Sequence, residues 1–298
     1  MTDNIYKICP TYETDTFTLR LIKVEDAENL LNCYSDKQVS QKANKDYCTS
    51  DFYYTTVKEM EECIRFWLKE YEEQRYVRFA IILKSTDKAV GTLEIFGGED
   101  GVLRIDIACS FEKHIEELIR LTVFNLIKDF NIKSLKIKAS NTPDRIPLLE
   151  KYGFIPSETF RKGLGYYERP IFRFFDESKG VAYCGLACCV CSENENCKGC
   201  RNDGCKDKNW CKSYNCCKAK KLNGCWECEQ FPCDYSILNK LRVKTFAKYI
   251  GKNSDEKLIS KLQEFEKDGI LYHHYKKLVG DYDLFESEND ILDFLDNT

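Results

Sequence analysis

Apolar residues in roughly the first 175 positions follow two periods, a two-residue alternation typical of strands and a three-to-four-residue spacing typical of helices. The alternating runs predict strands at residues 17–21, 79–83, 90–96, 102–109, 135–139 and 169–175. Helical spacing predicts helices at residues 24–34, 57–73, 111–130 and 142–152. Turns at residues 85–88 and 97–101 separate three consecutive strands. This order predicts an antiparallel meander within a mixed central sheet flanked by helices, an α/β (α+β) fold.

The pattern changes near Glu177 to Gly180, a short polar joint. Residues 184–233 show neither period, and helical spacing returns at residues 234–250, 255–267 and 287–295. In the second of these, Leu258, Leu262 and Phe265 form one apolar stripe. We therefore expect an α/β domain at residues 1–178 and a second domain at residues 179–298, made of a cysteine-rich module (179–235) and a helical tail (236–298).

Composition narrows the class of protein. The 298 residues are 43% hydrophobic and 13% aromatic, as in soluble globular proteins of two domains. The Met1 to Thr18 stretch carries Asp3, Glu13 and Asp15 in place of a basic start and an apolar core. We therefore expect a cytoplasmic protein with neither a signal peptide nor a membrane helix. The net charge of -4 gives no general signal for nucleic-acid binding.

Cysteines are concentrated in one segment, with thirteen of the eighteen between Cys184 and Cys233. A reducing cytosol disfavours disulfides and leaves thiolates free to hold metal. The pairs Cys197/Cys200 and Cys225/Cys228 have the spacing that brings two thiolates from one turn onto one ion. With only three histidines in the chain, all-cysteine sites are expected. The predicted ligands are Cys184, Cys188, Cys191, Cys197, Cys200, Cys211, Cys216, Cys225, Cys228 and Cys233.

The segment resembles a prokaryotic cysteine-rich family of unknown function whose members begin with C-G-L-x-C-x-x-C and end with C-x-x-C-x-x-x-P-C. The resemblance covers about residues 180–250 and implies metal binding. Two zinc ions are expected, while iron–sulfur ligation stays an alternative although the ferredoxin run ending in Cys-Pro is absent. Spacing alone leaves open which four cysteines share an ion.

Six lysines lie between Lys206 and Lys221, with Trp210 and Tyr214 among them. Such a surface can stack bases and bind phosphate. Lysines beside thiolate-bound zinc also neutralise its negative charge, and this second interpretation is favoured. Nucleic acid is therefore not the expected partner. The adjacent His273 and His274 would point to different faces, so we expect no shared metal there.

Roughly residues 15–175 resemble the GNAT superfamily of acetyltransferases, nearest to its branch that acetylates protein N-termini and small amines. The resemblance is carried by Thr18-Leu19-Arg20-Leu21 followed by Glu25-Asp26-Ala27, by Val90-Gly91-Thr92-Leu93, and above all by Asn141 ahead of Leu148-Leu149-Glu150-Lys151-Tyr152-Gly153-Phe154. It implies acetyl-CoA as cofactor and a small-molecule or peptide amine as acceptor.

In that family acetyl-CoA lies where two parallel strands splay apart, with its pyrophosphate at the start of the next helix. The resemblance places the strand at residues 102–109 and the helix start near Glu112. The implied cofactor-binding residues are Ile107, Ala108, Cys109, Lys113, His114, Asn141 and Arg145. The family's glycine-rich run is missing here, and Glu112, Glu116 and Glu117 would repel a phosphate near the helix start.

The resemblance implies direct attack of an amine on the thioester, with a carboxylate taking the proton. Glu94 and Asp106 are the expected bases, although both also suit outward-facing strand positions. The tyrosine that relatives use to protonate the leaving thiol is Leu149 here, so Tyr152 is the expected substitute.

The leading hypothesis is an acetyl-CoA-dependent N-acyltransferase whose zinc module supports the fold or recognises the acceptor. The alternative is a catalytically lapsed protein of the same fold whose zinc module binds a protein or nucleic acid. The sequence does not set the oligomeric state.

Overall fold

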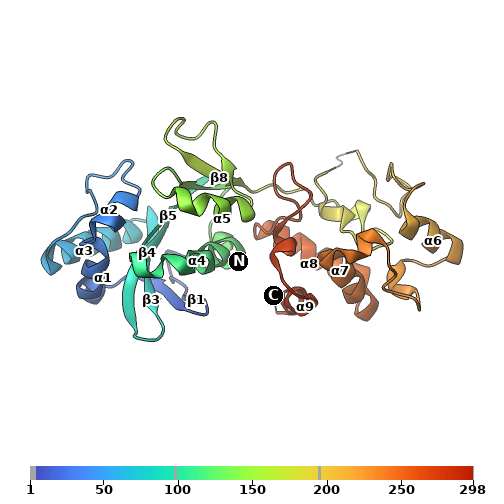
Figure 1. The fold of residues 1–298 in the computed structure, drawn as a ribbon, viewed down its shortest axis with the longest axis horizontal. Coiled ribbons are helices and arrows are strands. Elements are labelled where there is room, and N and C mark those ends of the chain that lie inside the picture. The colour runs from blue at the N-terminus through green and yellow to red at the C-terminus, as the bar shows by residue number, and fades with distance from the viewer. Residues whose placement is uncertain (1–4, 97–98, 194–195, 298) are drawn as a thin grey trace. The chain divides into compact units, whose positions relative to one another are not determined.

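The computed structural model describes residues 5–96, 99–193 and 196–297, and the chain divides into two compact units, residues 1–171 and 172–298 (Figure 1). The expected domain boundary, between residues 178 and 179, stays a prediction. Gly97 and Gly98, in the expected turn at 97–101, lie outside the described residues. Within the described ranges no helix combines the length and apolarity needed to cross a membrane.

The first unit is built on one mixed sheet with strand order β1-β2-β3-β4-β5-β6-β8-β7. The strands are β1 (Tyr12–Glu13), β2 (Phe17–Leu21), β3 (Tyr76–Leu83), β4 (Lys88–Phe96), β5 (Asp100–Ile107), β6 (Ser134–Lys138), β7 (Ile155–Pro156) and β8 (Tyr166–Pro170). The expected meander is present, because β2 to β5 pair antiparallel in sequence order. Strand β5 then pairs with β6 in parallel. The predicted α/β fold with a mixed central sheet is therefore confirmed.

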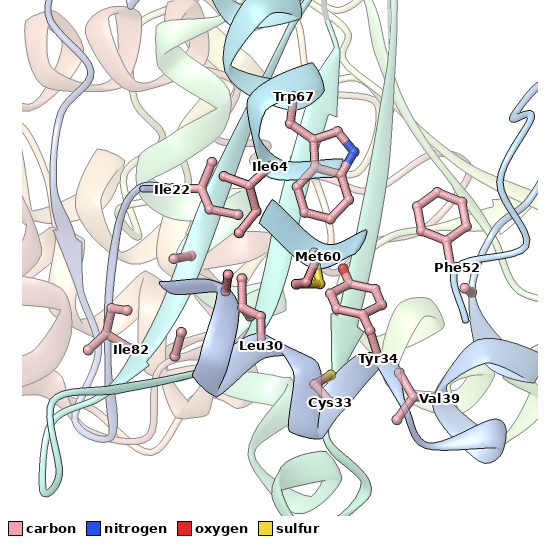
Figure 2. Packing of buried hydrophobic residues seen from close by; sticks show 14 residues of the cluster. Ile22, Leu30, Cys33, Tyr34, Val39, Phe52, Met60, Ile64, Trp67 and Ile82 are labelled. Atoms are coloured by element: carbon pink, nitrogen blue, oxygen red, sulfur yellow. The ribbon is translucent and has the colours of Figure 1, made fainter. Parts of the chain in front are cut away.

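In the described part of this unit, the helices that flank the sheet are α1 (Ala27–Tyr34), α2 (Lys37–Lys42), α3 (Val57–Glu72), α4 (Ile115–Leu121) and α5 (Ile146–Lys151). Helix α3 begins with a capping box in which Thr56 accepts from the backbone of Glu59 and the Glu59 carboxylate accepts in return. Its Met60, Ile64 and Trp67 are buried, as their spacing of three and four residues predicts. Figure 2 shows these side chains turned toward those of α1 over the sheet.

Three sequence expectations in this unit are wrong in detail. The helix expected at 111–130 is a 3-10 turn (Cys109–His114), then α4, then a π turn (Thr122–Leu126). The Thr122 hydroxyl donates to the Leu118 carbonyl at 2.7 Å, a local bond that competes with regular helix. The last strand ends at Pro170, not at residue 175, because a proline has no N–H for the ladder. The helix expected at 142–152 begins as a 3-10 turn (Pro143–Arg145), and α5 itself spans Ile146–Lys151.

The second unit contains α6 (Lys212–Lys220), α7 (Leu241–Lys252), α8 (Asp255–Lys267) and α9 (Glu288–Asp296). The helices expected at 255–267 and 287–295 are confirmed within about a residue, and the predicted apolar stripe of α8 is buried. The expected helix at 234–250 begins only at Leu241, because Lys240 has an extended backbone that separates it from a short 3-10 turn. Helices α2 and α6 were not predicted.

Candidate functional site

A buried ionic network lies on the face of the sheet that α1 and α3 cover. Register places Arg78 opposite Glu94 on β4, and Glu94 opposite Arg104 on β5. Arg78 Nε donates to Glu94 Oε2 at 3.0 Å, and a terminal nitrogen of Arg104 donates to Glu94 Oε1 at 2.8 Å. None of the three side chains is more than 9% exposed. Both oxygens of Glu94 are thus engaged by guanidinium groups, which opposes its expected role as a proton acceptor.

Asp106 is the better placed of the two expected bases. Its side chain is 6% exposed, Tyr34 donates to Oδ2 at 3.1 Å, and Arg78 lies 3.6 Å away. Burial raises the pKa of Asp106, although Arg78 and the Tyr34 hydrogen bond act in the opposite direction. A carboxyl whose pKa moves toward neutrality suits general-base chemistry.

Tyr152, the expected acid, is 1% exposed and donates to Glu116 Oε1 at 3.1 Å. Burial raises the pKa of Tyr152 to about 12. Its hydroxyl therefore contacts α4, whereas Glu94 and Asp106 contact arginines and Tyr34. The structure does not bring the three predicted catalytic side chains into one hydrogen-bonded group.

The expected cofactor cleft lies where β5 leaves β6. The parallel pairing ends at Leu103 with Ile137, while β5 continues to Ile107. The space between the strands is about 10 Å³, room for about one water molecule. Arg145, 5% exposed, lines this space and donates to the Ile105 carbonyl at 3.0 Å. A backbone acceptor in the splayed region is therefore already occupied.

Arg145 also makes a two-pronged ion pair with Glu112. Its Nε lies 2.6 Å from Oε1 and a terminal nitrogen lies 3.1 Å from Oε2, while Lys42 Nζ lies 3.7 Å from Oε2. Burial raises the pKa of Glu112, but the hydrogen bonds and charges of Arg145 and Lys42 outweigh this effect and lower it. A carboxylate consequently occupies the helix start where the resemblance places a phosphate.

The backbone at this helix start is also engaged. In the 3-10 turn at 109–114, the Phe111 N–H donates to the Ala108 carbonyl at 2.9 Å. The Ile115 N–H donates to the Glu112 carbonyl. The phosphate site of the family depends on amides left without helical partners. The N–H groups of Phe111 and Ile115 are therefore already used within the chain.

The other expected cofactor residues make internal contacts or face solvent. Ile107 is buried in β5, and Ala108 donates its N–H to the Val90 carbonyl at 3.0 Å. His114 Nδ1 lies 2.8 Å from Glu117 Oε1, and Lys113 is exposed. The remaining two are Cys109, which donates to Gln38 Oε1 at 3.6 Å, and Asn141, which donates to the Ala43 carbonyl at 3.0 Å.

A segment at residues 43–46, here called the bridging segment, holds both strands of the cleft. Arg104 of β5 donates to the Asp46 carbonyl at 3.0 Å. Lys138 of β6 donates to Asp46 Oδ1 at 2.8 Å, and Tyr166 of β8 donates to Oδ2 at 3.0 Å. The bridging segment thus ties β5 to β6 at the point where they separate.

Seven cysteines of the second unit line one cavity of about 830 Å³: Cys184, Cys188, Cys191, Cys197, Cys200, Cys205 and Cys211. Six of them are predicted ligands. Two of these sulfurs accept backbone N–H groups, from Gly199 to Cys197 at 3.4 Å and from Tyr214 to Cys211 at 3.5 Å. His273 also lines the cavity, and burial lowers its pKa to about 4.

A second group contains Cys217 and Cys225, whose sulfur atoms lie 3.8 Å apart. Two thiolates bound tetrahedrally to one zinc at about 2.3 Å lie about 3.8 Å from each other, so this spacing suits zinc. The hydrogen bond from Cys217 lowers the pKa of Cys225 to about 7. Lys220 donates to Cys228 Sγ at 3.5 Å, consistent with lysines that neutralise thiolates.

The described residues contain no group of three or more His, Cys, Asp or Glu side chains arranged to hold one ion. All eighteen cysteines are free thiols, with no disulfide among them. The donor chemistry therefore fits a soft metal, while the metal sites themselves stay a prediction.

Sequence reasoning missed Arg78, Arg104, Cys205 and Cys217. The ionic network had one signal in the sequence. Arg78 is a charged residue within an apolar run, between Val77 and Phe79. Cys217 directly follows the predicted ligand Cys216, and only its buried position on α6 distinguishes the two.

No family model and no curated protein matches this chain. Solved acetyltransferase structures resemble it over 54% of its length. One is a ribosomal alpha-N-protein acetyltransferase in complex with coenzyme A, at 10% identity and a TM-score of 0.44, matched over 98% of its own chain. Another is a ribosomal-protein alanine acetyltransferase from Vibrio fischeri, at 12% identity and a TM-score of 0.42, matched over 96% of its own chain. A third is a GNAT-family acetyltransferase from Bacillus anthracis, at 14% identity and a TM-score of 0.41, matched over 98% of its own chain. At this identity the similarity concerns the fold alone.

Proposed function

We propose that the first unit binds a ligand on an acetyltransferase fold without using acyl-CoA, and that metal ions held by cysteine stabilise the second unit. The observation that carries the first part is the position of Arg145. It occupies the splay between β5 and β6, bonded at once to the Ile105 carbonyl and to the Glu112 carboxylate.

The energy of displacing Arg145 supports this proposal. An incoming acyl-CoA would have to detach the guanidinium from both partners, and loss of this half-buried ion pair costs about 2 kcal/mol. It would then bring phosphate charge toward Glu112, a repulsion of about 4 kcal/mol for unit charges near 4 Å at an effective dielectric constant of 20. These two costs oppose cofactor binding together.

The test is a thermal-shift titration of the full chain with acetyl-CoA up to about 1 mM. We expect no change in the melting temperature of the first unit. A ligand at about 100 times its Kd would add about 2.7 kcal/mol of stability, which is several degrees for a domain of this size. A saturable rise in the melting temperature with acetyl-CoA, absent when buffer alone is added, would refute the proposal.

The second candidate is an acyl-CoA-dependent N-acyltransferase acting on a primary amine, either a protein N-terminus or a small amine. The parallel strands that separate beyond Leu103, and the buried Asp106 carboxyl with its raised pKa, favour it. This function predicts that free coenzyme A thiol is released when an amine is added together with acetyl-CoA. A thiol reagent measures the release, and a sample without amine is the blank.

For the second unit we propose two zinc ions. Elemental analysis of purified full-length protein should give about two zinc per chain. A ratio below one ion per chain would contradict the proposal, and iron with acid-labile sulfide would identify iron–sulfur clusters instead.

A further inference from the structure

A cavity of about 610 Å³ lies beside the ionic network of the first unit, and this volume is within the range of sites for small molecules. Its described lining includes seven aromatic side chains, four of them in the loop at residues 47–54. The other three are on α3 and β3: Phe66, Trp67 and Tyr76. Figure 2 shows Trp67 and Phe52 near the ring of Tyr34. The faces of aromatic rings carry partial negative charge, so these walls attract cations.

Carboxylates outnumber cationic groups in the lining, which contains two arginines and four glutamates: Glu59, Glu62, Glu70 and Glu94. The two guanidinium groups, those of Arg78 and Arg104, are no more than 9% exposed, and both donate to Glu94. Arg78 also lies 3.6 Å from Asp106. The positive charge of the inner wall is thus matched by buried carboxyl groups, and the other glutamates leave the lining negative.

The uncompensated negative charge lies on one face of α3. Glu59, Glu62 and Phe66 are three and four residues apart, so their side chains share this face, and all three are exposed. Among the described residues neither carboxylate has an ion-pair partner, and the neighbouring Arg65 and Lys69 pair with other glutamates of the helix. Two like charges at this spacing repel each other. A cation from a ligand would relieve that repulsion beside an exposed aromatic ring.

The hydrogen bonds of these carboxylates favour an alkylated ammonium over a primary one. A primary ammonium has three N–H donors, each of which needs an acceptor when it leaves water. Both oxygens of Glu94 accept from arginines, and both oxygens of Glu70 accept from Arg75. Glu59 Oε2 already accepts from backbone N–H groups of the helix cap. A quaternary ammonium needs no acceptor, because negative charge and aromatic faces are sufficient to bind it.

We propose that this cavity binds a small quaternary ammonium compound, with its cationic group between the aromatic side chains of the 47–54 loop and the face of α3 that carries Glu62 and Phe66. The inference rests on the proposed function, ligand binding without acyl-CoA, and deepens it by naming the ligand class. Such a ligand is not an acyl acceptor, because a quaternary nitrogen has neither a hydrogen nor a lone pair.

Three probes that share one benzyl group test the inference on the full chain: benzyltrimethylammonium, benzylamine and benzyl alcohol. Calorimetric titration should show benzyltrimethylammonium binding about tenfold tighter than benzyl alcohol, because only the cation gains from the aromatic faces and the carboxylates. It should also bind more tightly than benzylamine, whose N–H groups lose water without gaining enough acceptors. Tighter binding of benzylamine would overturn the inference and support an amine acceptor. Equal affinity for the alcohol, or no binding of benzyltrimethylammonium, would also overturn it.

Variants at exposed side chains test the position of the cationic group. Glu62→Gln should lower the affinity ratio of benzyltrimethylammonium to benzyl alcohol about threefold, the effect of one exposed charge. Phe66→Leu keeps an apolar side chain but removes the aromatic face, and should lower the same ratio about twofold. The matched control is Glu61→Gln, because this carboxylate is on the same helix, pairs with Arg65 and does not line the cavity. Each ratio is measured within one protein and so does not depend on stability. An unchanged ratio in Glu62→Gln or in Phe66→Leu would refute the assigned position.

The acetyl-CoA titration separates failure of this inference from failure of the proposed function. Binding of benzyltrimethylammonium together with a shift caused by acetyl-CoA would keep this site and reject the proposed function. Failure of both compounds to bind would leave the closed cleft standing and reject the ligand class.

Discussion

One buried cluster in the first unit and one in the second differ in the side chains that form them. A buried cluster of fourteen residues beneath α1 and α3 includes one cysteine, Cys33, among aliphatic and aromatic side chains. A buried cluster of eight residues in the second unit includes four: Cys184, Cys200, Cys217 and Cys225. A thiol side chain buries less apolar surface than leucine or phenylalanine, so the second cluster gains less from the hydrophobic effect.

The difference concerns the cysteine-rich segment, because the helices of the second unit also bury large apolar side chains such as Phe246, Leu262 and Phe265. The first unit has a continuous sheet whose strands pair mainly with their sequence neighbours and whose helices cover it with large side chains. Where the structure describes it, the segment from Cys184 to Cys233 has one α-helix, α6, and two short 3-10 turns, at Cys188–Val190 and Cys225–Glu227. Segments with so little core usually need disulfides or metal, and the cysteines here are free.

The largest predicted effect is therefore metal removal from the full chain. A chelator with a reducing agent should unfold the cysteine-rich segment, because structural zinc contributes about 10 kcal/mol or more to folding. Hydrogen exchange should show lost protection in α6 and α7, with β3 to β5 unchanged. Equal protection in both units before and after chelation would remove the distinction drawn between them.

The first unit should instead be sensitive to its buried ions. Glu94→Gln leaves Arg78 and Arg104 without their shared carboxylate, and we expect a loss of about 3–5 kcal/mol in unfolding free energy. Exchange of the β4 amides measures it. The control is Glu61→Gln, whose pair with Arg65 is on the surface and should change stability by less than about 1 kcal/mol. Similar losses in the two variants would contradict the role of the network.

Sequence patterns were sufficient for the elements whose stability is local or amphipathic. The alternation in β2, the three-to-four spacing of α3 and the apolar stripe of α8 each predict which face of the element is buried. The interrupted helix after Phe111 was not foreseen, because it depends on one hydroxyl, that of Thr122, bonding a carbonyl. Helix α6 was not foreseen because its nine residues have no clear apolar face.

The candidate sites were harder, since they depend on contacts between distant residues. The missing glycines near Glu112 drew attention to the helix start, but only the fold reveals that Arg145, 33 positions away, pairs with Glu112 there. The cavity beside Arg104 involves a loop, a helix and three strands, and no local motif connects them. Cysteine spacing, in contrast, is a local signal, and six of the seven thiols that line one cavity are among the predicted metal ligands, whose role stays a prediction.

Glu112→Gln should have a smaller, pH-dependent effect. The folded-state pKa of Glu112 is lowered overall, so its stabilising contribution is present above the unfolded value of about 4.3 and is lost as pH falls below it. We expect the variant to be about 2 kcal/mol less stable at pH 7, with the difference shrinking toward pH 3. Denaturant unfolding followed by β5 exchange measures this difference. A gap independent of pH would mean that packing, and not the ion pair with Arg145, holds the cleft closed.

The smallest effects give the sharpest comparison, because the two units contain the same cap. Thr56 at α3 and Ser287 at α9 each accept a backbone N–H at 3.2 Å and each belong to a capping box. Thr56→Ala and Ser287→Ala should each cost about 1 kcal/mol in the metal-loaded protein. After chelation, exchange in α3 should still report the Thr56→Ala loss, whereas α9 should no longer distinguish Ser287→Ala from the parent chain. If the Ser287 difference persists without metal, then α9 folds independently of the cysteine-rich segment, and metal stabilises that segment alone.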